Sequence, residues 1–416
     1  MLGTGLISIA ISILLASLST QSSTVVIREV RVIDGTGKAA IQADVVVVGN
    51  RIRAITTDSQ QWQSGNHTTI IDGRNKTLLP GLIDLHIHLV AGGDTPSDKE
   101  ALTLFYRTKI PEILNQYLVA GVTSIQSTGD PLDETLRLRD QINRGEIRGP
   151  RLYVAGPVVT AVGGHPATTI FRNNPFGRSL VAAEVSNEDE AREQIRFLKR
   201  KGVDYVKFVY QGDGVRTQKL RPGIARVIID EAHKLDLRVG VHSGGIEDTV
   251  FLLESGVDTL LHGISQQITD DNVIQLLANK KAYYVATLQV MNRPGAPILR
   301  TANTMANLGL VSKHAVKIAV GTDTFLPFFK PGVNTHREAA LMVEAGMTPM
   351  AVIVAATRTA AEQLQKLSDF GTVEPGKVAD LLIVEGNPDQ DIQALGSVHT
   401  VIREGQIVVR EGKLIP

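Results

Sequence analysis

The sequence predicts an α/β protein, a (β/α)8 TIM barrel joined to a small β-sandwich domain that is built from both termini. The middle of the 416-residue chain alternates apolar strands with amphipathic helices, and β-rich segments flank it at both ends. Repeated βα units indicate a parallel sheet, and residues 78–366 are long enough for a barrel with insertions. A doubly wound open sheet is the alternative, but no glycine-rich phosphate loop follows the early strands.

Residues 24–77 and 367–416 are predicted to form the β-sandwich together. The first segment contains β-branched runs such as 30–33 and 44–48, and the second contains 379–384. Such runs between turn residues are typical of strands. Because exposed strand edges need partners, we expect the two β-rich ends to share one domain.

One βα unit of the predicted barrel can be read in full. Ser186 and Asp189 are predicted to form a capping box, an apolar stripe at helical spacing follows, and Gly202 ends the helix. A strand over residues 203–209 comes next. Further units continue the pattern, with helices over 224–235 and 247–254 and strands over 237–242 and 258–262.

The composition excludes several classes of function. The formal net charge is +0, so no global field attracts nucleic acid or an anionic membrane, and neither is expected as a partner. The chain contains no cysteine, which excludes thiolate zinc sites, disulfides and a cysteine nucleophile. A small-molecule substrate is the expected partner, and a homo-oligomer stays open.

Residues 1–23 carry no charged side chain and contain an apolar run over 7–18. This run has the length of a signal-peptide core and is short for a membrane span. We therefore predict a signal peptide and a secreted or periplasmic protein without stable membrane insertion after its removal. Because basic residues are missing ahead of the run, an uncleaved membrane anchor is the alternative.

The first predicted barrel strand ends in a His-x-His motif. Residues 78–88 form an apolar run entered through a Pro-Gly turn, and it contains His86 and His88. The two-residue period of a strand places both imidazoles on one face, close enough to bind one metal ion. Neutral imidazole is the commonest metal ligand, and Asp84 is placed to accept a supporting hydrogen bond.

Further polar residues stand at the C-terminal ends of later predicted strands. In a (β/α)8 barrel the active site is assembled at that face from several strand ends. A lysine inside an apolar strand is especially informative, because an unpaired buried ammonium group is costly. These strand-end residues are Lys207, His242, His262 and Asp323.

This combination of motifs resembles the amidohydrolase superfamily, and within it the branch of imidazolonepropionases and Xaa-Pro dipeptidases (prolidases). The resemblance covers nearly the whole chain after residue 23. One departure is Leu261 before His262, where relatives often carry an acidic residue. The matching segments are 80–88, 321–323, 344–349 and 371–381.

The resemblance implies a binuclear metal-dependent hydrolase. The implied ligands are His86, His88 and Asp323 for one divalent ion, His242 and His262 for the second, and Lys207 as the bridge between them. Lys207 would be N6-carboxylated by CO2, a reaction that the lowered pKa of a desolvated amine favours. The ions are expected to be zinc, with manganese or cobalt as alternatives, and would share a hydroxide. Asp323 would be the proton shuttle that passes the hydroxide proton to the departing nitrogen.

The implied reaction is hydrolysis of an amide-type C–N bond in a dipeptide (Xaa-Pro or similar) or an N-acyl amino acid. By resemblance, His165, after a third strand over residues 152–159, would polarise the substrate carbonyl, and Tyr210 would contact the substrate carboxylate. Arg216 and Arg221 lie in the loop after Tyr210 and offer bidentate contacts to the same group.

Two alternative functions stay open. The first is a cyclic-amide (imidazolone-type) hydrolase or a deaminase of the same fold. Deaminases of the superfamily generally lack the carboxylated lysine, so Lys207 argues against the deaminase and not against the cyclic-amide hydrolase. The second is a non-catalytic barrel scaffold, against which the complete set of six ligands argues.

Overall fold

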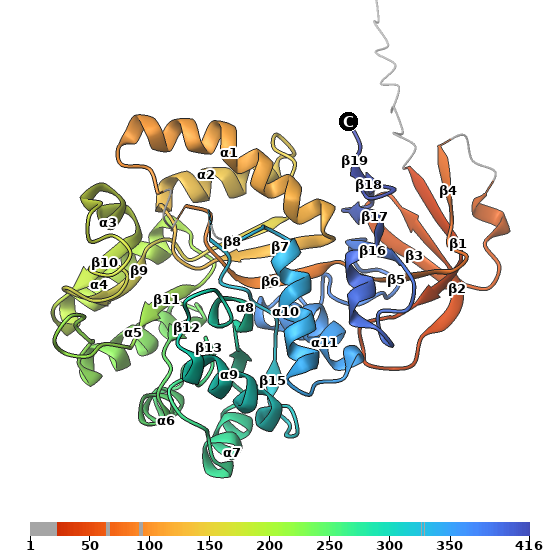
Figure 1. The fold of residues 1–416 in the computed structure, drawn as a ribbon. Coiled ribbons are helices and arrows are strands. Elements are labelled where there is room, and N and C mark those ends of the chain that lie inside the picture. Colours follow the sequence, from red (N-terminus) through yellow and green to blue (C-terminus); the bar gives the residue numbers. More distant parts are fainter. Residues whose placement is uncertain (1–22, 64–66, 91–94, 326, 328) are drawn as a thin grey trace, which may run out of the picture.

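The computed structural model of the protein describes residues 23–63, 67–90, 95–325, 327 and 329–416. They form a mixed α/β fold, with a sheet from the two chain ends beside a larger region of strands and helices (Figure 1). The predicted signal peptide lies outside the described residues, apart from Ser23. Within the described ranges, no helix has the length and apolar character needed to cross a membrane.

Strands from both chain ends pair in one nine-stranded sheet. β5 (Lys76–Pro80) joins the two ends, because it pairs parallel with β1 (Thr24–Val32) and antiparallel with β16 (Leu381–Glu385). The strand order is β19-β18-β17-β16-β5-β1-β2-β3, and β4 also pairs with β1. The two-layered sandwich and the domain boundaries stay predictions. The other strands are β2 (Ile41–Val48), β3 (Arg51–Thr56), β4 (Thr68–Asp72), β17 (Val398–Arg403), β18 (Gln406–Arg410) and β19 (Lys413–Leu414).

The larger region contains two parallel sheets. One has the order β6-β7-β8 and the other the order β10-β9-β11-β12-β13-β14-β15. The strands of the first are β6 (Leu82–Ile87), β7 (Val122–Ser127) and β8 (Arg151–Val154). Those of the second are β9 (Val158–Ala161), β10 (Ala182–Val185), β11 (Val206–Val209), β12 (Val239–His242), β13 (Thr259–Leu261), β14 (Tyr283–Val285) and β15 (Lys317–Ile318).

Backbone hydrogen bonds connect the two parallel sheets. The segment after β15 bonds to β6, since Leu85 N–H donates to Val320 O at 3.0 Å and Asp323 N–H donates to His86 O at 2.7 Å. On the other side, Asp204 N–H donates to the carbonyl of Val154 in β8 at 2.8 Å, just before β11 begins. This arrangement is consistent with a TIM-barrel-like domain.

The helices follow the strands as the apolar periodicity predicts. The capping box of α4 lies one residue later than predicted: Asn187 accepts from Glu190 N–H at 2.9 Å, and Glu190 accepts from Ser186 N–H at 2.8 Å. Gly202 ends α4 with φ 86°, as predicted. The helices are α1 (Lys99–Val119), α2 (Leu132–Asn143), α3 (Pro175–Val181), α4 (Glu188–Lys201), α5 (Pro222–Lys234), α6 (Ile246–Glu254), α7 (Asp271–Lys280), α8 (Leu288–Met291), α9 (Ile298–Val311), α10 (Val333–Glu344), α11 (Pro349–Ala356) and α12 (Arg358–Gln363), with 3-10 turns η1 (Gln60–Trp62) and η2 (Ile392–Gly396).

The third strand differs from the prediction. Residues 152–159 form not one strand but parts of β8 and β9, which are separated by Ala155, Gly156 and Pro157. Gly156 has φ 74°, a conformation that leaves the extended region, and Pro157 has no N–H for a ladder bond. The break moves β9 away from β7 and beside β11.

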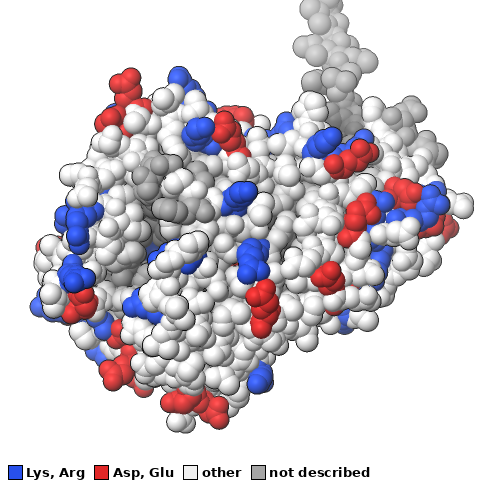
Figure 2. Space-filling model, viewed as in Figure 1, with Lys and Arg blue, Asp and Glu red and all other residues white. Residues whose placement is uncertain are grey.

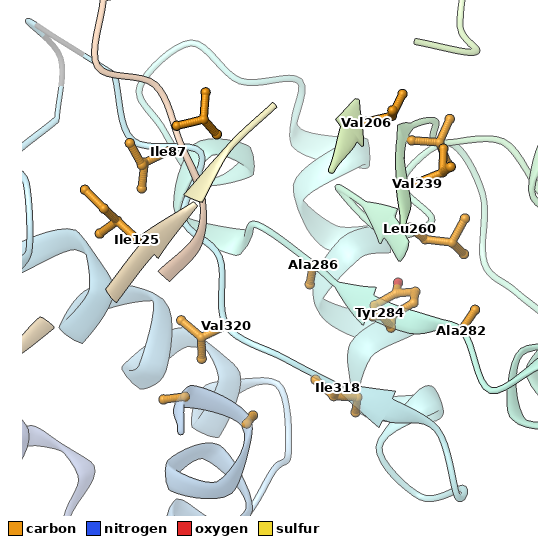
Figure 3. Packing of buried hydrophobic residues seen from close by; sticks show 14 of the residues in the cluster. Ile87, Ile125, Val206, Val239, Leu260, Ala282, Tyr284, Ala286, Ile318 and Val320 are labelled. Atoms are coloured by element: carbon orange, nitrogen blue, oxygen red, sulfur yellow. The ribbon is translucent and has the colours of Figure 1, made fainter. Parts of the chain in front are cut away.

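Buried apolar side chains pack around the parallel strands (Figure 3). Val206 and Phe208 of β11 belong to this core, whereas Lys207 and Val209 line a cavity. The alternation follows from the two-residue period of a strand. In β11, one face therefore packs in the core and the other face carries Lys207 to the cavity.

Candidate metal centre

The predicted metal ligands meet at one cavity of about 520 Å³. The face of the βα region turned toward the viewer in Figure 2 is hollowed, and positive and negative side chains are interspersed over the molecule. The residues that line the cavity include all six predicted ligands, His86, His88, Lys207, His242, His262 and Asp323.

Each ligand reaches the cavity through its position at the end of a parallel strand. His86 lies in β6, Lys207 in β11 and His242 at the last position of β12. His262 follows β13 directly, and Asp323 lies in the segment that bonds to β6. Because the carboxyl ends of parallel strands meet at one face, residues far apart in the sequence become neighbours.

Asp323 lies at the centre of this group. Its Oδ1 is 3.1 Å from His88 Nε2 and 3.4 Å from His86 Nε2, and its Oδ2 is 3.7 Å from His262 Nδ1. Ligand atoms of His86, His262 and Asp323 all lie within 4.8 Å of one another. Metal–nitrogen distances are about 2.0–2.1 Å, so a single ion can contact ligands with this spacing.

Lys207 and His242 extend the group. Lys207 Nζ lies 3.5 Å from His86 Nε2. The ring centroids of His242 and His262 lie 4.2 Å apart, and His165 lies 4.8 Å from His242 by the same measure. The structure therefore brings together both predicted ligand sets and the lysine predicted to bridge them.

The protonation states of the imidazoles fit a metal site. Burial lowers the pKa of His86, His242 and His262 well below the ordinary value, so these rings are neutral, the form that binds metals. Burial also acts to lower the pKa of His88, but the hydrogen bond and charge of Asp323 raise it overall. In the described part of the chain, buried His86 Nδ1 has no hydrogen-bond partner. The other ring nitrogen of His86, Nε2, is the one that faces Asp323 and Lys207.

Lys207 is 3% exposed, and burial lowers its pKa to about 7, although the charge of Asp323 acts in the opposite direction. At neutral pH a substantial fraction of the amine is therefore uncharged. Only the uncharged amine is a nucleophile. This property makes Lys207 suited to reaction with CO2.

Asp84 fixes the strands that carry two of the ligands. Its buried carboxylate accepts from the backbone N–H groups of His86 and Thr322 at 3.2 and 3.0 Å. The hydroxyls of Thr322 and Thr335 also donate to it, at 2.9 and 3.0 Å. Burial raises the pKa of Asp84 to about 6. The predicted supporting role thus acts on the backbone of His86 and not on its imidazole.

A second buried carboxyl group supports His262 indirectly. Thr287 Oγ1 lies 2.9 Å from His262 Nδ1. The next two backbone N–H groups, of Leu288 and Gln289, donate to Glu338 at 2.8 and 2.6 Å. Burial raises the pKa of Glu338 to about 8. Glu338 therefore fixes the turn that positions Thr287 against the ligand.

His88 and His242 have supports of their own. The carbonyl of Gly129 lies 3.2 Å from His88 Nδ1, and the Asp130 carboxylate accepts from the N–H of Leu89 at 3.0 Å. Gln211 Oε1 lies 2.7 Å from His242 Nε2. Such outer contacts orient ligand side chains. Sequence reasoning missed Asp130, Gln211, Thr287 and Glu338, because none of them stands in a recognisable motif.

Several site residues have left-handed backbone conformations. The φ angles are 79° at His262, 51° at Thr287 and 54° at Asp323. Non-glycine residues rarely adopt positive φ, and such strain is concentrated at functional sites. The surrounding hydrogen bonds hold two of the six ligands in these conformations.

His165 lies where a carbonyl-polarising group is needed. It lines the cavity beside His242, and Thr169 Oγ1 contacts its Nδ1 at 2.7 Å. Burial lowers the pKa of His165 to about 4, so the ring is neutral at physiological pH. A neutral ring can donate one hydrogen bond into the cavity.

The structure does not bring Tyr210, Arg216 or Arg221 to the cavity lining. The alternation that turns Lys207 inward turns Tyr210 outward, and its ring stacks on Phe251 with centroids 5.1 Å apart. The guanidinium of Arg221 donates to the carbonyl of Ser186 at 2.8 Å, and Arg216 is exposed. Their predicted contact with a substrate carboxylate gains no support from this geometry.

Two arginines that the sequence analysis did not select line the cavity instead. Arg293 and Arg300 lie in the segment between α8 and the first turn of α9. This segment has no periodic pattern that would reveal which side chains face the site. The segment follows β14 at the same end of the sheet as the ligands, and this position was the one signal in the sequence that it could line the site.

The fold and the cavity define a class of protein that carries histidine, lysine and aspartate at the strand ends of a TIM-barrel-like domain. The chain belongs to the amidohydrolase family, whose sequence model matches residues 77–408. This match confirms the family predicted from the motifs.

Similar proteins include hydrolases that are named for different substrates. Ochratoxinase from Aspergillus niger is 26% identical over 87% of this chain and 81% of its own length. Imidazolonepropionase from Alkaliphilus oremlandii is 24% identical over 89% of this chain and 91% of its own. Among solved structures, a Xaa-Pro dipeptidase with bound methionine in its active site has a TM-score of 0.78, with 26% identity over 92% of this chain and 99% of that one.

Proposed function

We propose that this protein is a binuclear metal-dependent hydrolase that cleaves an amide-type C–N bond. The observation that carries the proposal is the convergence of four histidines, Lys207 and Asp323 on one cavity. A scaffold would have no need to bury this lysine, because an unpaired buried amine destabilises the fold. The fold that we propose for this activity is a closed (β/α)8 barrel with a β-sandwich from both termini.

Two divalent ions fit the donor set, with zinc as the first candidate. His86, His88 and Asp323 would hold one ion, and His242 and His262 would hold the other. N6-carboxylated Lys207 would be a ligand of both ions. The ions would supply Lewis-acid polarisation of the scissile carbonyl and of a water molecule. Nitrogen and oxygen ligands without thiolates suit zinc, and they also allow manganese or cobalt.

The side chains of the chain itself supply orientation and proton transfer. Asp323 can take a proton from the attacking water and deliver it to the departing nitrogen, since its carboxylate faces the centre of the site. His165 can donate a hydrogen bond to the substrate carbonyl as negative charge develops on its oxygen.

A dipeptide or an N-acyl amino acid is the proposed substrate. The Xaa-Pro dipeptidase similarity supports it, and the name ochratoxinase shows that a relative acts on a different compound. The similarity to imidazolonepropionase supports a cyclic amide as the second candidate. We also propose export of the protein, from the uncharged apolar run over residues 7–18.

The proposal is tested by elemental analysis combined with a substrate screen. Purified protein should contain about two divalent ions per chain and should hydrolyse dipeptides or N-acyl amino acids. Lactones and cyclic ureas belong in the same screen. One ion or none in active protein would refute the binuclear centre, and activity confined to lactones would refute the C–N bond.

Asp323→Asn separates proton transfer from metal binding. The amide keeps one oxygen ligand but cannot accept the proton, so turnover should fall by at least about a hundredfold while much of the metal is retained. Unchanged turnover in the metal-loaded variant would exclude Asp323 as the proton shuttle.

A further inference from the structure

The charges around the cavity are unevenly distributed. Among the residues that line it, the carboxylate of Asp323 is the only acidic side chain, and the ligand group already contains it. Arg293 and Arg300 are the arginines of the lining. The mouth of the cavity therefore presents positive charge that the described lining does not neutralise.

Arg300 is the better placed of the two arginines. It lines both the cavity and a neighbouring hollow, and both spaces also contact His165, Gln211 and His242. Arg300 thus lies at the junction through which a bound molecule would extend away from the metal ligands. The exposed fractions of its neighbours Ile298 and Leu299 are 87% and 69%, which places this first turn of α9 at the rim.

The guanidinium of Arg300 makes no hydrogen bond or ion pair within the described ranges. Arg293, in contrast, donates to the carbonyl of Val290 at 2.8 Å. The neighbouring hollow also contains Asp213, but this carboxylate accepts from the backbone N–H groups of Val215 and Arg216 at 3.0 and 2.7 Å. These bonds hold Oδ1 of Asp213 within its own loop, and no ion pair joins Asp213 to Arg300 in the described part of the chain, so the Arg300 donors remain available.

We propose that Arg300 binds a free carboxylate of the substrate, on the side of the leaving amine. This inference rests on the proposed function, since the carboxylate of a dipeptide or N-acyl amino acid belongs to the amine that leaves. A planar guanidinium matches a carboxylate with two parallel hydrogen bonds. Arg293 adds favourable charge at the same opening.

This assignment differs from the one that the sequence favours. The ring of Tyr210 is 4% exposed and stacks on Phe251, and Lys219 Nζ lies 4.5 Å from its centroid. These contacts hold the ring outside the cavity. Recognition of the carboxylate therefore belongs to the first turn of α9, where Arg300 lines both spaces.

The first experiment compares Ala-Pro with Ala-prolinamide as substrates of metal-loaded protein. Wild-type protein should prefer the free dipeptide at least tenfold in kcat/KM. Arg300→Gln should raise KM for the free dipeptide at least tenfold, with little change in kcat and little change for the amidated substrate. Arg107→Gln, on the exposed face of α1, is the matched control. It should leave the kinetic constants for the free and the amidated dipeptide unchanged.

The second experiment measures binding without turnover, by calorimetry with L-proline and L-prolinamide. Wild-type protein should bind L-proline at least tenfold more tightly, and Arg300→Gln should abolish the difference while circular dichroism and metal content stay unchanged. Equal losses for both ligands, or no loss, would overturn the assignment. A selective loss in Tyr210→Phe alone would also overturn it, and would return recognition to the 210–221 loop.

The two experiments separate this inference from the proposed function. If the protein prefers L-proline through Arg300 but hydrolyses no amide, the carboxylate site is supported and the proposed reaction is refuted. If it hydrolyses amides equally well with and without the carboxylate, the proposed reaction is supported and the carboxylate site is refuted.

Discussion

Lys207 and His86 are two buried bases whose nitrogens, Nζ and Nε2, lie 3.5 Å apart. The charge of Lys207 adds to burial in lowering the pKa of His86. A positive lysine at this position would repel any cation held by His86. Under the proposed function, carboxylation by CO2 would replace that repulsion with attraction and would give a lysine a role among the candidate metal ligands.

Lys207→Ala should therefore lose most of the bound metal and the activity with it. Added short carboxylic acids should restore part of both, because they can occupy the space of the missing carbamate. Metal content and turnover are measured with and without acetate or propionate. Lys280→Ala, at the exposed end of α7, is the control. Full metal content in Lys207→Ala without added acid would exclude the bridging role.

Asp84→Asn should weaken metal binding by about 10- to 100-fold, as expected for a group that orients ligands from outside the first coordination sphere. The amide has one acceptor oxygen in place of two, so at least one bond to Thr322 or Thr335 is lost. Competition with a chelator measures the affinity. Asp230→Asn, on the exposed face of α5, should leave it unchanged. Equal affinity in both variants would show that the fold holds His86 and Asp323 without Asp84.

Glu338→Gln should change how stability depends on pH. The pKa of this carboxyl rises from an ordinary 4.5 to about 8 on folding, so between these values the folded chain keeps a proton that the unfolded chain has lost. Stability therefore falls as pH rises through this window, by at most about 1.4 kcal/mol per pH unit. Glutamine removes this contribution.

Denaturant unfolding of both proteins at several pH values between about 5 and 8 tests this prediction. The difference in unfolding free energy, variant minus wild type, should increase with pH. Glu254→Gln, which alters an exposed side chain, should give a constant difference. A constant difference for Glu338→Gln would show that its pKa is not raised by folding.

The mature protein should begin near residue 20 and lie outside the cytoplasm. The reason is the uncharged apolar run over residues 7–18, followed by small residues suited to cleavage. N-terminal sequencing of protein from fractionated cells measures this. An intact Met1 in the membrane fraction would favour the anchor, and an intact Met1 on soluble cytoplasmic protein would contradict both readings.

The six residues that meet at the cavity could be predicted from the sequence, because the ends of strands can be recognised in it. Apolar runs locate β6, β11, β12 and β13. A polar residue at the C-terminal end of such a parallel strand lies at the face where the active site of a barrel is assembled. The same alternation places Tyr210 outside the cavity, since Tyr210 lies three positions after Lys207 along an extended segment and an odd offset turns it to the opposite face. In this case the strand period was a better guide than the resemblance.

Other parts of the site could not be predicted, because they depend on tertiary contacts without a local pattern. Glu338 reaches the backbone beside Thr287 from a helix that follows all the ligands in the sequence. The positive φ angles of His262 and Asp323 have no signature, since neither residue type requires them. Arg300 lies in an aperiodic segment, where only the folded chain shows which side chains face the opening.

The pairing of β5 with β16 has a consequence for biosynthesis. Pro80 lies opposite Leu381, so most of the chain must be made before this sheet can be completed. Until then β5 presents an unpaired edge, and such edges promote association with other chains. Contacts between distant residues also form slowly. Premature termination before β16 should therefore leave this edge exposed and yield aggregates, not a smaller working enzyme.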